Sequence, residues 1–170
     1  SYAVLIDADG DFSSGASVNM LTLQSGNLYY KNTVTIADGY YVTIAEVQNV
    51  SSGTGDFNDP TKWLTGVVPA TGQNITIVSP HVITLTGNQT TGSVTVALGA
   101  TLNLASNTLT LDGVGGSLII SGTFNAGTGT VNYAAAGAQC ISALTYYNLS
   151  IGGSGTKTLC GDIDVNGNLT

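Results

Sequence analysis

Residues 75–104 read ITIVSPHVITLTGNQTTGSVTVALGATLNL, and this stretch decides the fold. Its apolar residues alternate with Thr or Asn in short runs such as Ile75-Thr76-Ile77 and Val94-Thr95-Val96, with Gly, Asn or Pro between the runs. Alternation with a period of two and an excess of β-branched residues indicates short strands. Val94 follows Ile75 by 19 residues, and Leu102 follows Ile83 by the same step. The stretch therefore predicts a repeating unit with two or three short strands.

A similar step continues further along the chain. Val131 follows Leu109 by 22 residues, and Leu169 follows Leu149 by 20. A near-constant step of about 20 residues predicts a parallel β-solenoid (β-helix), in which Val, Ile and Leu stack inside while Thr and Asn face water. The alternative is an antiparallel β-sandwich, which also has many short strands. No stretch shows a helical period, so the predicted fold class is all-β in either case.

One segment interrupts the alternation. Residues 48–73 contain the single Trp and two of the three Pro. We therefore expect three parts: an N-terminal β-strand portion at 1–47, a loop-rich Trp/Pro junction at 48–73 and the main solenoid at 74–170. Within the junction, three residues are expected to pack together, namely Phe57, Trp63 and Pro69.

The junction resembles the opening of a known module. Residues 52–63 read SGTGDFNDPTKW and are followed by Gly66-Val67-Val68-Pro69 and by Asn74-Ile75-Thr76-Ile77. This pattern is similar to the start of G8-like β-solenoid modules in large secreted and cell-surface adhesin-type proteins of gliding bacteria, exported by type IX secretion. Phe57 stands where Trp is commoner in those modules. The resemblance implies a solenoid and an extracellular or cell-surface location, but it implies little about function, because such modules are scaffolds.

Composition excludes several classes of partner. Charged residues make up 8 % of the chain, against a usual share of about 25 %. Three Lys, no Arg and a formal charge of −7 leave no basic cluster for a phosphate backbone, so we expect no nucleic-acid partner. No apolar run approaches the roughly 18 residues of a membrane span, so we expect no membrane insertion.

The densest group of carboxylates is a candidate calcium site. Asp7, Asp9 and Asp11 alternate around Gly10, and hard cations such as Ca²⁺ prefer oxygen ligands. The run lacks the spacing of an EF-hand loop and its closing Glu, so a solvated acidic turn is the alternative. We expect no other cofactor.

The two cysteines are a candidate disulfide. Cys140 and Cys160 are 20 residues apart, which is one coil of the predicted repeat. Neighbouring strands lie about 5 Å apart, so a disulfide joining two coils is one interpretation in an oxidising compartment. A stacked pair of free, buried thiols is the other.

Catalytic residues are not indicated. Asp162 and Asp164 alternate in one run and face the same side of a strand, but no Arg, His or Lys accompanies them. His81 follows a Pro at a turn and has no evident orienting partner, which catalysis by His needs. We therefore predict no enzyme, and we rank a β-helix polysaccharide-degrading enzyme lowest.

The favoured hypothesis is an extracellular structural or adhesive protein, a solenoid subunit or module of a surface fibre or adhesin. It would assemble with itself or with neighbouring modules through open strand edges. The expected interaction edges are Ala3, Val4, Leu5, Ile6, Leu169 and Thr170. A carbohydrate- or ice-binding module with a flat Thr-rich face remains the alternative, with glycans as candidate partners.

Overall fold

The computed structural model describes residues 2–12, 16–25, 28–31, 33–46 and 48–170. The chain divides into two compact units, Ser1–Gln48 and Asn49–Thr170. Both units are built from strands, and the helical content of the described residues is one 3₁₀ turn, η1 (Pro60–Lys62). The all-β fold class predicted from the sequence is confirmed.

The first unit is a small antiparallel structure. Its three-stranded sheet has the order β2-β1-β5, and a separate hairpin pairs β3 with β4. The strands are β1 (Tyr2–Asp7), β2 (Ser17–Met20), β3 (Thr22–Ser25), β4 (Leu28–Tyr30) and β5 (Tyr41–Glu46). The interaction edge expected at Ala3, Val4, Leu5 and Ile6 is not open, because β1 is the central strand and its backbone pairs with β2 on one side and β5 on the other.

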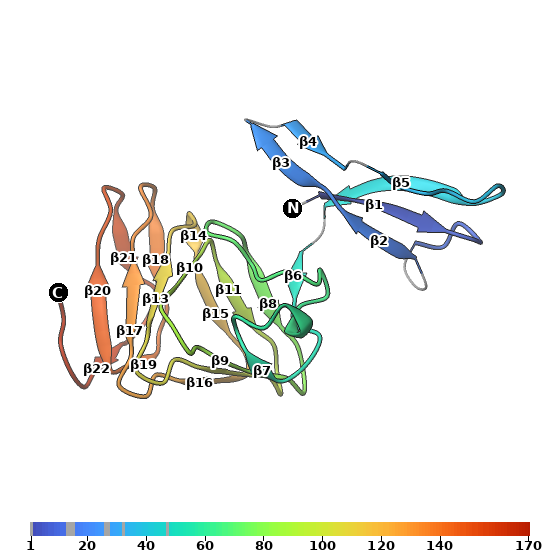
Figure 1. Ribbon diagram of the computed structural model, residues 1–170. Coiled ribbons are helices and arrows are strands. Elements are labelled where there is room, and N and C mark those ends of the chain that lie inside the picture. Colours follow the sequence, from blue (N-terminus) through green and yellow to red (C-terminus); the bar gives the residue numbers. More distant parts are fainter. Residues whose placement is uncertain (1, 13–15, 26–27, 32, 47) are drawn as a thin grey trace. The chain divides into compact units, whose positions relative to one another are not determined.

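The second unit is a parallel β-solenoid (Figure 1). The antiparallel sandwich is excluded, because every strand pair in this unit is parallel. Its strands are β6 (Asn49–Val50), β7 (Gly55–Asp56), β8 (Ile75–Ile77), β9 (Val82–Thr84), β10 (Gln89–Thr91), β11 (Val94–Val96), β12 (Thr101–Asn103), β13 (Thr108–Leu111), β14 (Gly115–Gly116), β15 (Leu118–Ile120), β16 (Thr123–Asn125), β17 (Thr130–Tyr133), β18 (Gln139–Ile141), β19 (Thr145–Tyr146), β20 (Asn148–Ile151), β21 (Lys157–Leu159) and β22 (Asp164–Val165).

Three stacked sheets form the walls of the solenoid. The first has the order β15-β11-β8-β6, the second β16-β12-β9-β7 and the third β10-β13-β17-β20. Two shorter sheets, β14-β18-β21 and β19-β22, complete the later coils. Each wall is one strand per coil, so each coil pairs its backbone with the coils before and after it, and stability comes largely from these interfaces.

The registers match the predicted coil step. Ile75 pairs with Val94 in the first sheet, and Leu109 pairs with Val131 in the third. The last predicted step is an isolated parallel bridge between Leu149 and Leu169. The paired positions are inward and mostly buried, because burial of each aliphatic side chain against the same kind of side chain in the next coil stabilises the stack.

The segment at 48–73 forms the first coil of the solenoid. Asn49 pairs with Ile75, and Gly55 pairs with Ile83. The expected division into a junction at 48–73 and a stack from 74 therefore differs from the structure, in which the unit boundary lies between Gln48 and Asn49 and the junction residues belong to the stack.

Candidate functional site

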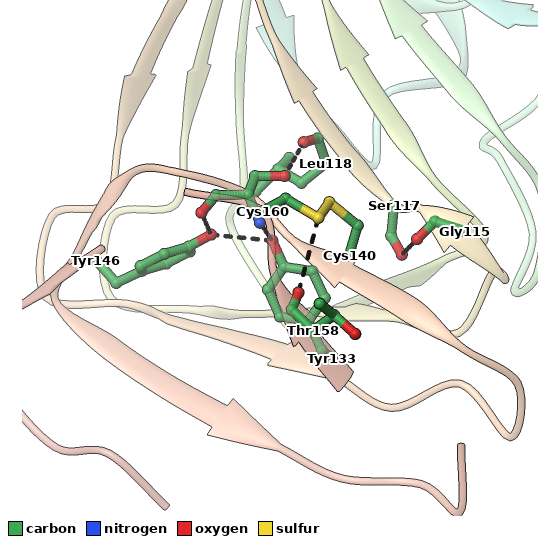
Figure 2. The surroundings of a disulfide bond; sticks show 9 residues. Gly115, Ser117, Leu118, Tyr133, Cys140, Tyr146, Thr158 and Cys160 are labelled. Carbon is green, nitrogen blue, oxygen red and sulfur yellow. Dashed lines mark hydrogen bonds between the residues drawn. A yellow bond between two sulfur atoms is a disulfide. The ribbon is translucent and has the colours of Figure 1, made fainter. Parts of the chain in front are cut away.

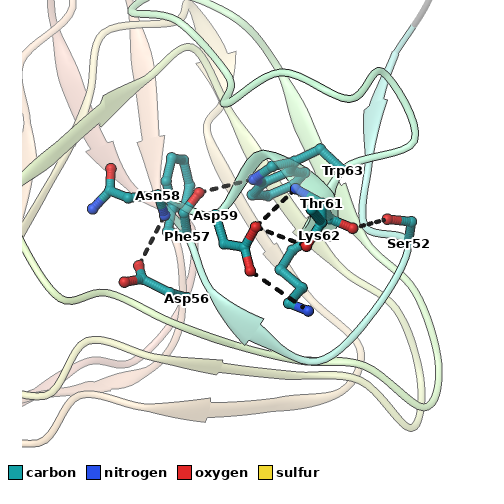
Figure 3. Close-up of polar contacts among 8 residues, drawn as sticks. All are labelled: Ser52, Asp56, Phe57, Asn58, Asp59, Thr61, Lys62 and Trp63. Carbon is teal, nitrogen blue, oxygen red and sulfur yellow. Dashed lines mark hydrogen bonds and ion pairs between the residues drawn. The ribbon is translucent and has the colours of Figure 1, made fainter.

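The first coil ends in a compact cap. Phe57 and Trp63 are 0 % and 2 % exposed, and their rings pack edge to face with centroids 5.1 Å apart. The Trp63 indole N–H donates to the backbone carbonyl of Phe57 at 2.8 Å (Figure 3). Pro69 is also buried. The three residues that the sequence singled out for packing are thus interior residues at this end of the stack, and Phe57 and Trp63 are in direct contact.

Short-range polar contacts shape the cap. Asp59 caps η1, because its side chain accepts hydrogen bonds from the backbone N–H and the hydroxyl of Thr61 at 2.9 and 2.7 Å. These bonds, with a smaller contribution from Lys62 at 3.6 Å, lower the pKa of Asp59. The aliphatic stem of Lys62 lies against Gly55, where a Cβ would come within 2.7 Å of Lys62 Cε. The cap therefore covers the strand β7 with the aliphatic stem of Lys62.

The cap also occupies the outer edge of β6. Ser51 forms an antiparallel bridge with Trp63, Ser52 N–H donates to Lys62 O at 2.8 Å, and Leu64 N–H donates to Val50 O at 2.9 Å. The backbone groups that a further strand would need at β6 are therefore already paired within the chain.

The last coil differs from this capped end. Its strands β21 and β22 have hydrogen-bonded neighbours on one side only, which are β18 and β19. Leu159 and Leu169 are 57 % and 61 % exposed, although Leu169 continues a column that is buried in the previous coils. Within the part of the chain that the structure describes, the strand edge and the apolar side chains of this coil are thus uncovered, including the predicted interaction residues Leu169 and Thr170.

A disulfide between Cys140 and Cys160 ties the last coil to the preceding one (Figure 2). Cys140 is half-buried and points away from the core, between the inward residues Gln139 and Ile141. Its register partner is Thr158 rather than Cys160, so the bond links positions two residues apart in the ladder. The bond is therefore a cross-link on the outer side of the coils, and a buried pair of thiols is excluded.

Polar groups inside the solenoid hold neighbouring coils together. The Gln139 side chain is 2 % exposed; its amide nitrogen donates to the carbonyls of Leu111 and Gly113, both at 2.9 Å, and its oxygen accepts the Ala135 N–H at 3.0 Å. Gly115 is its register partner in β14. Sequence reasoning missed Gln139, and the available signal was a polar residue at an inward position opposite a glycine.

A second interior network joins two tyrosines. The hydroxyls of Tyr133 and Tyr146 are 2.9 Å apart, and Tyr146 donates to Ser142 O at 2.7 Å (Figure 2). Burial and, secondarily, the bond to Tyr133 raise the pKa of Tyr146 well above its usual value. The neighbouring Tyr147 is exposed, so adjacent tyrosines face opposite sides of the wall.

The outer face of the third sheet carries a regular polar array. In register, one column contains Thr90, Thr110, Asn132 and Ser150, and a second contains Thr108, Thr130 and Asn148. We call these seven side chains the third-sheet array. All are partly exposed, and they alternate with the buried apolar column of the same strands.

The second sheet presents a different outer face. Asn125 donates to the side-chain oxygen of Asn103 at 2.7 Å, and Asn103 donates to Thr84 Oγ1 at 3.2 Å. This column of side chains is therefore bonded from coil to coil within the protein.

The acidic residues that the sequence singled out as a candidate calcium site lie in one turn. Asp7 is 5 % exposed, and its Oδ1 accepts the N–H groups of Asp9 and Gly10 at 2.8 Å; Asp9 Oδ1 accepts the Asp11 N–H at 2.9 Å. These carboxylates stabilise a local turn. Across the described ranges, no group of three or more His, Cys, Asp or Glu side chains is placed to hold a metal ion.

His81 has a partner that the sequence did not reveal. Its Nδ1 lies 2.9 Å from Ser51 Oγ, and the same hydroxyl accepts the Val78 N–H at 3.0 Å. Nucleophilic catalysis needs an accessible hydroxyl beside the base, but Ser51 is 1 % exposed. The contact between Ser51 and His81 links the first two coils.

The two alternating carboxylates, Asp162 and Asp164, are exposed in the last coil.

The described part of the chain includes no helix with the length and hydropathy of a membrane span. No protein-family model, curated protein or solved structure matches this chain.

Proposed function

We propose that this chain is a structural and adhesive module of an extracellular protein, and that copies of it join through open strand edges. The observation that carries the proposal is the strand edge and the apolar side chains of the coil at 157–170, which no other part of residues 49–170 covers. The β6 edge is paired with the cap, whereas β21 and β22 offer an unpaired edge flanked by the exposed Leu159 and Leu169. Exposed strand edges with apolar neighbours pair readily with other strands.

A second open edge supports assembly beyond a dimer. β5 is the end strand of its sheet, and Tyr41, Val42 and Ile44 on it are 57 %, 45 % and 68 % exposed. Association through one edge gives a closed pair, whereas two separate edges on each copy allow an open filament. The low charge content removes much of the repulsion that would keep such edges apart.

The extracellular location rests on two features. The chain carries a disulfide, and disulfides persist mainly in oxidising compartments. Its surface is solvated by hydroxyl and amide groups rather than by ions, as the 8 % share of charged residues shows. Binding and assembly account for these features without catalysis.

Light scattering after size-exclusion chromatography, followed by negative-stain electron microscopy, tests the proposal. The wild-type protein should form filaments with rising concentration. Leu159→Lys and Ile44→Lys, which each place a charge at one open edge, should stop filament growth. Leu98→Lys is the matched control, because Leu98 is 80 % exposed on a turn of the solenoid, and it should assemble like wild type. A wild-type protein that stays monomeric throughout, or equal loss of assembly in the control, would overturn the proposal.

A further inference from the structure

We propose that the third-sheet array binds an extended, uncharged polysaccharide, an inference that rests on the adhesive function proposed above and names the class of its ligand. The array comprises Thr90, Thr108, Thr110, Thr130, Asn132, Asn148 and Ser150. It contains neither a charged nor an apolar side chain, so it matches a neutral ligand rich in hydroxyl groups rather than an ion or an apolar protein surface.

Most hydrogen-bonding groups of the array are left unused by the protein. The exception is Asn148, whose amide nitrogen donates to Thr128 O and Gly129 O and whose Oδ1 accepts the Asn168 N–H. Among the described residues, the hydroxyls of the four threonines and of Ser150 have no protein hydrogen-bond partner. The second sheet shows that this solenoid can satisfy such a ladder internally, because Asn125, Asn103 and Thr84 bond to one another. In the second sheet only this one outward column is bonded internally, whereas both outward columns of the third sheet keep unbonded hydroxyls, and this difference points to the third sheet as the binding face.

The geometry of the array suits a long chain. Adjacent coils are spaced by about 4.7–4.9 Å, and side chains two residues apart on one strand are separated by about 7 Å. Two parallel columns of hydroxyl and amide groups therefore run along the solenoid axis, one over four coils and the other over three. Their backbone is fixed by the sheet, so little conformational entropy is lost on binding, and contacts repeated along one chain add through avidity.

An aromatic side chain lies beside the columns. Tyr147 immediately precedes Asn148, is 38 % exposed, and its ring lies against Gly167, where a Cβ would be 3.3 Å from Tyr147 Cδ1. An exposed tyrosine offers both an apolar ring face and a hydroxyl, which are the two kinds of surface that a sugar ring presents. The mixture of Thr, Asn and Ser beside this ring favours a glycan over an ice lattice, which would be matched by identical side chains.

Binding assays with insoluble polysaccharides test this inference. Cellulose, chitin and starch granules are the neutral probes, and alginate beads are the charged control. The variant Thr110→Val/Thr130→Val removes two hydroxyls from the array and keeps the side-chain shape. The matched control is Thr101→Val/Thr123→Val, which makes the same change on the outer face of the second sheet.

We expect wild-type protein to bind at least one neutral polysaccharide and not alginate. The array variant should bind about tenfold more weakly, because two hydrogen bonds are lost, and Tyr147→Ala should also weaken binding. The control variant should bind within twofold of wild type, and all three should retain the wild-type thermal midpoint. Binding to none of the neutral probes, an equal loss in the control, or modification of ice growth without glycan binding would overturn the inference.

The assembly proposal and the glycan-binding proposal are tested by separate measurements. Assembly is scored by filament formation without glycan, and the array variant should still assemble, because its changes lie on a sheet face and not on an open edge. Loss of glycan binding with intact filaments would overturn only this inference.

Discussion

The indole N–H of Trp63 donates to the backbone carbonyl of Phe57 at 2.8 Å while the two rings pack edge to face. This pair folds the end of the first coil back over the core, so that one loop supplies both the apolar cover and the partners for the β6 edge.

Removing the Trp63 ring should uncover that end of the core. We expect Trp63→Ala to lower the free energy of unfolding by about 3–5 kcal/mol, and Trp63→Phe, which keeps an aromatic ring but leaves the Phe57 carbonyl unpaired, by about 1–3 kcal/mol. Urea denaturation followed by far-ultraviolet circular dichroism measures both. Leu64→Ala is the control, because Leu64 is 63 % exposed; a loss as large as that of Trp63→Ala would contradict the role of the cap.

Reduction of the Cys140–Cys160 bond should loosen the last coil. A cross-link closing a loop of this length stabilises a protein by about 3 kcal/mol in the chain-entropy account, and the exposed coil has few buried contacts to replace it. The double variant Cys140→Ser/Cys160→Ser should reproduce this loss of unfolding free energy. It should also be insensitive to reductant, and destabilisation of the variant by reductant would show that the effect arises elsewhere.

Because neighbouring coils are in close contact at Gly113, replacing this glycine should destabilise the protein. A Cβ at Gly113 would lie 2.3 Å from Gly92 O, the same atom to which the Gly113 N–H donates at 2.8 Å. We expect Gly113→Ala to lower the free energy of unfolding by about 1–3 kcal/mol. Gly87→Ala is the control, because a Cβ there meets only an Asn58 side-chain atom at 3.9 Å, and it should leave the unfolding free energy unchanged or slightly raised.

The buried Tyr146 should make stability fall in strongly alkaline solution. Its pKa is raised in the folded state, so above about pH 10 the unfolded chain loses this proton while the folded protein keeps it. Stability is thus fully present below pH 10 and falls above it, with Tyr146 contributing up to about 1.4 kcal/mol per pH unit. Tyr146→Phe should reduce the slope of unfolding free energy against pH, measured by denaturation between pH 8 and 12. An unchanged slope in Tyr146→Phe would contradict this account.

The coil stack was predictable because its signal is local and repeated. The pairs Ile75–Val94, Ile83–Leu102 and Leu149–Leu169 could be read from spacing alone, since each coil presents the same alternation to the next. Alternation was not sufficient everywhere: residues 34–36 alternate in the same way, yet they form no strand. A β-strand forms only where another strand can pair with its backbone, and the sequence of one segment does not show which other segment that is.

The candidate site was less predictable, because it depends on contacts between distant residues. The bond from Trp63 to Phe57 O and the contact of Ser51 with His81 involve no motif. Turns of unequal length also shift the register, so Cys140 faces Thr158 although Cys160 matches the average step. The third-sheet array emerges only when the outward residues of successive coils are aligned, because Thr occurs throughout the sequence.

The covalent link between the last two coils has a mechanical consequence. When force is applied to its two ends, a solenoid unfolds coil by coil, and each unfolded residue adds about 3.3–3.6 Å of extended length. Cys140 and Cys160 are 20 residues apart, and the chain between them cannot extend while the disulfide is closed. The closed bond therefore holds back roughly 70 Å of extended chain length. A solenoid built this way would stay short under tension in an oxidising medium and become extensible once the bond is reduced.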